Sequence, residues 1–128
     1  MKTKVLLMGF AASLLMLVPA IANQTKPRPV ESFTVVGTEP FWNVEINQSG
    51  ITYGTPEPKK VVFPYVAPLN AEGRPADSVR VYRLKGMTSG TLVIRKGACS
   101  DGMSDRKYDH SATMILGDTV KEGCAIKK

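Results

Sequence analysis

Short stretches in which apolar and polar residues alternate, separated by turn residues every 8–12 positions, fill the chain after residue 30. No apolar stripe with a helical period extends beyond about two turns. Such spacing predicts an all-β domain over residues 31–128, a small antiparallel barrel or sandwich of about seven or eight strands. The expected strands are 33–36, 41–47, 51–53, 60–66, 78–84, 91–96, 113–116 and 119–121.

The residues at the turns and the faces of two strands refine this prediction. Gln48-Ser49-Gly50 joins two strands, and Gly117-Asp118 suits a type II′ hairpin turn. The alternation in 41–47 places Trp42, Val44 and Ile46 on one face of the strand. The alternation in 78–84 likewise places Arg80, Tyr82 and Leu84 on one face. We expect a loop over 68–75 and a short helical turn near 104–109.

The N-terminal segment has the composition of an export signal. Lys2 and Lys4 precede an apolar run over 5–18, expected to be helical, which Pro19 ends. Small residues at 20 and 22 predict cleavage between Ala22 and Asn23, followed by a polar leader over 23–30. Because 14 helical residues are too short for a bilayer core about 30 Å thick, we expect a periplasmic or secreted protein. An uncleaved anchor is the alternative.

The charge balance is mildly basic. The 128 residues carry 17 Lys+Arg and 11 Asp+Glu, a net charge of +6, and loss of Lys2 and Lys4 leaves +4. The basic residues form no run of five or more, so we interpret the excess as a contribution to solubility. We expect a monomer that binds no nucleic acid and has no stable membrane insertion after cleavage.

Two cysteines lie in the exported part, Cys99 and Cys124, and an even pair in an oxidising compartment predicts a disulfide. Closing that 25-residue loop should stabilise the fold by roughly 3.5 kcal/mol. A metal site built with His110 is the alternative. The absence of close cysteine spacing argues against it, so we predict neither metal nor cofactor.

Residues 97–110 form the most polar segment, which we interpret as a loop. Carboxylates every four residues do not match the alternate spacing of a calcium loop. A serine with His110 and Asp105 would supply the groups of a nucleophile triad, although no Gly-x-Ser-x-Gly turn is present. More simply, serine and aspartate cap turns while Arg106 pairs with an acid. The candidate residues of this loop are Ser100, Asp101, Ser104, Asp105, Arg106 and Tyr108.

A second dense segment, 37–42, reads Gly-Thr-Glu-Pro-Phe-Trp. Alternation in the following residues favours Trp42 as a core anchor, and a platform that stacks on a ligand is the alternative. Glu39 precedes a proline, so it should be extended. A buried Glu39 paired with Arg95 or Arg106 would link the two segments.

These segments carry a resemblance to a known family. The residues GTEPFW (37–42), GITY (50–53), CSDGMSDRKY (99–108) and GC (123–124) resemble a family of small exported bacterial proteins labelled as uncharacterised, putative lipoprotein or predicted membrane protein. The resemblance implies export and a bridge between Cys99 and Cys124, and it brings no established activity. Asp109 stands where the family often has proline.

Three functions follow as hypotheses. The first is a non-catalytic cell-envelope domain that binds an unknown envelope ligand or protein through 97–110, with Glu39 and Trp42 as further candidates. The second is a proteinaceous inhibitor of an envelope-attacking hydrolase such as lysozyme. The third is a small hydrolase that uses Ser100 or Ser104, His110 and Asp105. No catalytic constellation is complete, so the first is our prediction.

Overall fold

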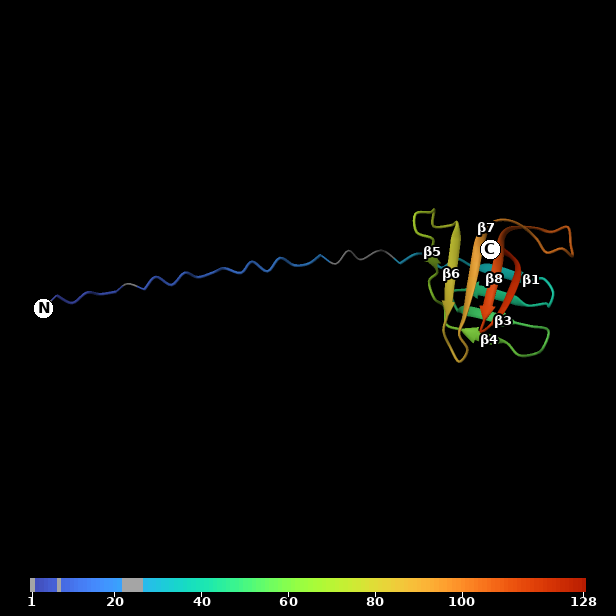
Figure 1. Cartoon of the computed structure of the whole chain (residues 1–128), viewed down its shortest axis with the longest axis horizontal. Coiled ribbons are helices and arrows are strands. Elements are labelled where there is room, and N and C mark those ends of the chain that lie inside the picture. Colours follow the sequence, from blue (N-terminus) through green and yellow to red (C-terminus); the bar gives the residue numbers. More distant parts are fainter. Residues whose placement is uncertain (1, 7, 22–26) are drawn as a thin grey trace.

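The computed structural model describes residues 2–6, 8–21 and 27–128. Within these ranges there is no helix, and therefore none able to span a bilayer. The apolar N-terminal segment is not the expected helix: its described residues, 5–6 and 8–18, have no regular secondary structure, and their side chains are exposed (Figure 1). A short apolar segment without tertiary contacts gains too little to hold a helix. The predicted cleavage site, Ala22–Asn23, lies outside the described residues.

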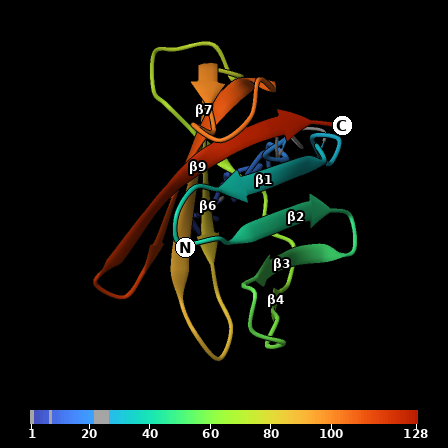
Figure 2. The same cartoon turned by 90° about the vertical axis from the view of Figure 1, so that its right-hand side faces the viewer.

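The described part of the chain confirms the all-β prediction, with nine strands rather than seven or eight. They form one antiparallel sheet in the order β4-β3-β2-β1-β9-β8-β7-β6-β5, curled into a half-barrel (Figures 1 and 2). Figure 2 shows the short strands β1, β2 and β3 crossing β6 and β7 at a steep angle. The strands are β1 (Phe33–Gly37), β2 (Asn43–Asn47), β3 (Gly50–Gly54), β4 (Val61–Phe63), β5 (Leu69–Asn70), β6 (Val79–Leu84), β7 (Gly90–Ser100), β8 (Lys107–Leu116) and β9 (Thr119–Lys127).

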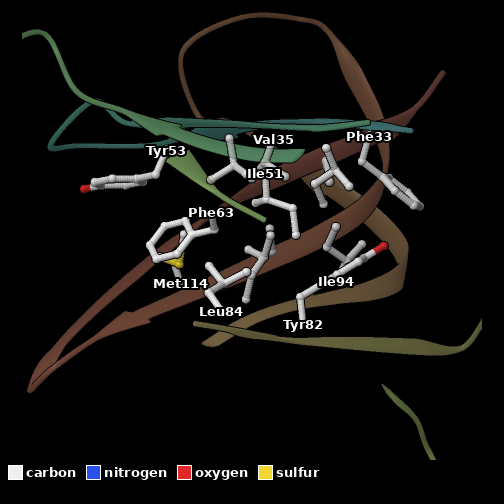
Figure 3. Close-up of a cluster of buried hydrophobic side chains, with 14 of the residues drawn as sticks. Phe33, Val35, Ile51, Tyr53, Phe63, Tyr82, Leu84, Ile94 and Met114 are labelled. Carbon is white, nitrogen blue, oxygen red and sulfur yellow. The ribbon is translucent and has the colours of Figure 1, made fainter. Parts of the chain in front are cut away.

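Alternate residues of these strands point into the half-barrel and form its core. Figure 3 shows side chains from the two halves of the curled sheet meeting there, with Phe63 beside Met114 and Leu84. Trp42, Val44 and Ile46 are all buried, as their shared face predicted. The largest fully buried side chains are Tyr82, Phe33, Phe63, Ile46, Ile51, Leu84, Leu92, Ile94 and Met114.

Two tight turns fix strand register as the sequence predicted. Gly117 has a φ of +56°, and within the described ranges no residue other than glycine has a positive φ, so Gly117-Asp118 has the signs of a type II′ turn. Gly50 closes the β2–β3 hairpin with a φ of +149°, and a side chain there would crowd the carbonyl of Phe63.

The predicted disulfide is present and holds β7 to β9 across the intervening β8. Cys99 and Cys124 have their Cα atoms 5.7 Å apart. The register between β7 and β8 shifts between Lys96 and Cys99, and this bulge carries Cys99 toward β9. The bridge therefore fixes the distal end of the β7–β8 hairpin against the middle of the sheet.

Several predicted boundaries are wrong. The expected loop over 97–110 is mostly strand, because β7 continues to Ser100 and β8 begins at Lys107. The helical turn expected near 104–109 is therefore replaced by a turn and the start of β8. Conversely, the strand expected over 60–66 shortens to β4, and part of the expected loop over 68–75 pairs as β5. Pairing with a long neighbouring strand extends β7 and β8 through polar residues that carry little strand signal of their own.

One buried group in the core lacks a hydrogen bond. The hydroxyl oxygen of Tyr82 is buried and has no partner among the residues that the structure describes. Burial raises the pKa of this phenol well above its ordinary range. A buried hydroxyl without a partner costs stability, whereas its ring contributes through burial.

Tyr82→Phe should therefore raise the free energy of unfolding by about 1 kcal/mol, because it removes the unpaired oxygen and keeps the ring. Urea denaturation followed by circular dichroism measures the change. A loss of stability in this variant would contradict the structure, since it would mean that the hydroxyl has a partner.

Candidate functional site

The segment 37–42 is a closed loop that seats Trp42 against the sheet. The backbone N–H of Gly37 donates a hydrogen bond of 2.7 Å to the carbonyl of Trp42. The indole lies directly on the backbone of Gly37, where any Cβ atom would overlap it. Its ring centre is 6.4 Å from that of Tyr53, and the residue is 3% exposed. The core interpretation of Trp42 is confirmed.

The tip of the β7–β8 hairpin, residues 101–106, is organised around Asp101. Oδ1 of this carboxylate accepts the backbone N–H groups of Met103 at 2.9 Å and Ser104 at 2.8 Å. Oδ2 accepts the Ser104 hydroxyl at 2.7 Å and the Tyr108 hydroxyl at 3.4 Å. Hydrogen bonds from Met103 and then from Ser104 stabilise the ionised form, which lowers the pKa of Asp101 to about 2. The expected turn-capping role of aspartate is thus observed.

These two segments lie side by side and form a groove of about 400 Å³. Trp42 and Phe41 line it from one segment, and Asp101, Met103 and Tyr108 line it from the other. Phe41 and Met103 are each about half exposed, 53% and 54%, whereas Trp42 and Tyr108 are buried. The structure brings together residues about sixty positions apart, and we name their junction the Trp42 groove. Its remaining lining residues are Val36, Gly37, Asn43, Thr55 and Pro56.

The other candidate residues surround the groove in supporting or peripheral positions. Ser100 accepts the Gly102 N–H at 3.2 Å, and Ser104 accepts the Arg106 N–H at 3.3 Å. The guanidinium of Arg106 lies 5.3 Å from the centre of the Tyr108 ring. Asp105 is exposed and does not line the groove.

The expected pairing of Glu39 is wrong. Glu39 is exposed, and among the ion pairs of the described residues none involves Glu39, Arg95 or Arg106. The stacking of Arg106 on Tyr108 replaces the acid partner expected for that residue. Residues of both segments line the groove, and within the described ranges no salt bridge links them.

His110 does not lie with the serines. Its Nδ1 is 2.7 Å from the Asp109 carboxylate, its Nε2 is 3.5 Å from Arg80, and its ring meets Phe33 edge-on at 5.2 Å. Within the part of the chain that the structure covers, neither Ser100 nor Ser104 hydrogen-bonds to it. Among all the residues that the structure describes, no three His, Cys, Asp or Glu side chains are arranged so that they could hold one metal ion.

Sequence reasoning missed a second polar cluster, centred on Arg80. This arginine is 3% exposed and forms a two-pronged contact with the carboxylate of Glu31. The hydrogen bond from Arg80 is the main cause that lowers the pKa of Glu31 to about 2. The signal in the sequence was the position of Arg80 on the same face as Tyr82 and Leu84, because a charge on a core-facing position needs a buried partner.

Comparison of the chain with family models, curated proteins and solved structures found no match.

Asp101→Asn should destabilise the domain at pH 7, because the amide group cannot accept both bonds that Oδ2 receives. The pKa of Asp101 is lowered from 3.8 to about 2. The ionised carboxylate therefore makes its full contribution to stability above about pH 4, and this contribution is lost as the pH falls toward 2. The difference in free energy of unfolding between wild type and variant should accordingly shrink across that interval.

Asp105→Asn is the matched control, since it removes an exposed carboxylate from the same turn. Chemical denaturation at a series of pH values measures both variants. Equal pH dependence for Asp101→Asn and Asp105→Asn would refute the role assigned to Asp101.

Proposed function

We propose that this protein is an exported, non-catalytic binding domain of the cell envelope that holds an apolar part of a partner protein in the Trp42 groove. The observation that carries the proposal is the convergence of the segments 37–42 and 101–108, the two most distinctive in the sequence, on one groove. Export rests on the N-terminal composition and is supported by the Cys99–Cys124 bridge, since disulfides persist in oxidising compartments.

The side chains at the rim favour an apolar partner. Phe41 and Met103, one from each segment that lines the groove, expose about half of their surface, and aromatic and methionine side chains are enriched at protein interfaces. Methionine adapts its shape to an apolar partner at little conformational cost. An apolar side chain inserted between them would rest on the Trp42 and Tyr108 rings.

The polar groups of the hairpin support binding rather than chemistry. Both oxygens of Asp101 already accept two hydrogen bonds each, so this carboxylate holds the hairpin in shape. His110 is directed toward Phe33 and Arg80, away from the groove. Because the Asp101 bonds hold the hairpin in shape, the hairpin loses little conformational freedom when a partner binds, and this strengthens binding.

Site-specific photo-crosslinking tests the proposal. A photoreactive phenylalanine derivative placed at position 103 in the full chain, expressed in bacterial cells, should yield a discrete protein adduct in the periplasmic fraction. Position 87 is the matched control, because Met87 is fully exposed and lies outside the groove. Excess wild-type protein should suppress the adduct, whereas excess Met103→Lys should not, because it places a charge on the apolar rim.

Equal adducts from positions 103 and 87, or none from 103, would refute the groove as the binding site. The chain recovered from the periplasmic fraction should begin at Asn23. Retention of residues 1–22 at the inner membrane would instead contradict the proposed export and release.

A further inference from the structure

The Arg80 cluster forms the floor of a cavity of about 1030 Å³, a volume just above the usual range of small-molecule sites. The cavity lies near the beginning of β1, whereas the Trp42 groove lies at its end. The segment 27–30 lines the cavity, together with Tyr65, Ala67 and Pro68. This lining is largely apolar, and its charged side chains are Arg28, Asp77 and the contacting group of Glu31, Arg80 and Lys127.

Arg80 is held as a fixed receptor for a carboxylate. Nε and Nη2 point at the two oxygens of Glu31, with Nη2 at 2.9 Å, which is the fork geometry that suits a carboxylate. Nη1 donates to the carbonyl of Asp77 at 3.0 Å, and the guanidinium carbon lies 5.0 Å from the centre of the Phe33 ring. The guanidinium would keep this orientation if another carboxylate replaced that of Glu31.

The charges at the floor favour an anion. Arg80 and Lys127 both contact Glu31, the latter at 2.8 Å, so two cations surround one carboxylate. The nearby carboxylate of Asp77 is neutralised separately by Lys96 at 2.7 Å. Glu31, Arg80 and Lys127 together therefore carry an excess of one positive charge, to which Arg28 of the lining adds another, and this charge attracts an anionic head group.

Glu31, whose carboxylate now lies on Arg80, belongs to the same segment as the lining residues 27–30. Glu31 precedes β1 and directly follows residues 27–30, so its carboxylate reaches Arg80 from outside the sheet. Its side chain is 29% exposed, whereas that of Arg80 is 4% exposed. The receptor is thus fixed in the sheet, and its carboxylate comes from an irregular segment at the surface.

We propose that this cavity binds a carboxylate that bears an apolar tail, such as a fatty acid, with its head group on Arg80 and Lys127 and its tail along the apolar walls. Glu31 occupies the head-group position when the ligand is absent and competes with it. The Trp42 groove takes no part, so this site is independent of the proposed function.

Binding of octanoate to the full chain and its variants tests this inference. Glu31→Gln removes the internal competitor and leaves the receptor in place, so octanoate should bind at least about tenfold more tightly than to wild type. Glu45→Gln is the matched control, because it removes a carboxylate from an exposed pair with Lys128. This control should bind like wild type, and any association of octanoate with the apolar N-terminal segment should be the same in all three proteins.

Isothermal titration measures affinity, and thermal unfolding with and without ligand reports binding to the folded state. Acetate tests whether the tail contributes, and 1-octanol tests whether the carboxylate does. Both should bind Glu31→Gln at least about tenfold more weakly than octanoate, because each lacks one half of the ligand. Equal binding of acetate would show an anion site without use of the cavity, and equal binding of octanol would show an apolar cavity without the head-group site. Either result would overturn the proposal.

Glu31→Asp provides a second route if Glu31→Gln fails to fold. The shorter side chain keeps the charge but reaches Arg80 less well, so octanoate affinity should again exceed that of wild type. Octanoate affinities within twofold of wild type in every folded Glu31 variant would also overturn the proposal.

Discussion

Trp42 occupies its position only because residue 37 has no side chain. The indole rests on the backbone of Gly37 at the end of β1, and the residue paired with Gly37 on β9 is also a glycine, Gly123. A Cβ atom at Gly123 would overlap the carbonyl oxygen of Val36, so β1 and β9 can approach closely only without one. The adjacent Cys124 then receives the bridge from Cys99. Trp42, the β1–β9 strand pair and the disulfide thus lie together where two paired glycines leave no room for side chains.

The two ends of β1 have different chemistry because different elements meet there. Near Gly37 the strand adjoins the 37–42 loop and the β7–β8 hairpin, and residues of both line the largely apolar Trp42 groove. Near Phe33, Arg80 of β6 contacts Glu31 in the segment that precedes β1, and β6 and β1 are not neighbours in the sheet. A charged pair therefore links the separated sides of the curled sheet at that end. Removing one partner of such a pair would leave a buried charge without compensation.

The sequence patterns predicted the features that depend on residues close to one another in the chain. Alternation located most of the strands and the buried face of Trp42, Val44 and Ile46, and glycine chemistry located two hairpin turns. The disulfide also followed from composition. The length of β7 and β8 did not, because the polar residues 97–100 and 107–110 become strand through pairing with each other and through the bulge at Lys96–Cys99.

The sequence predicted three residues that line the candidate site, Trp42, Asp101 and Tyr108, and it missed Phe41 and Met103, the exposed residues at the rim. Trp42, Asp101 and Tyr108 do share one groove, yet the ion pair that the sequence suggested for Glu39 is absent among the described residues, and Glu39 is exposed. Arg80 and Glu31 are 49 positions apart, and nothing in one strand pattern indicates a partner across the half-barrel. Which charged residue pairs with which is a property of the closed sheet rather than of either segment.

The most direct test of the account is the fluorescence of Trp42, the single tryptophan, in the variant Gly37→Ala. The φ of Gly37 is not positive, so alanine changes only the steric fit to the indole. We expect the emission to shift to longer wavelength as the ring is displaced into water, together with a lower melting temperature. Gly86→Ala should leave both unchanged, since its Cβ would make an ordinary contact of 3.5 Å with Phe63. Wild-type emission and stability in Gly37→Ala would contradict the seat assigned to Trp42, and with it the origin of the groove.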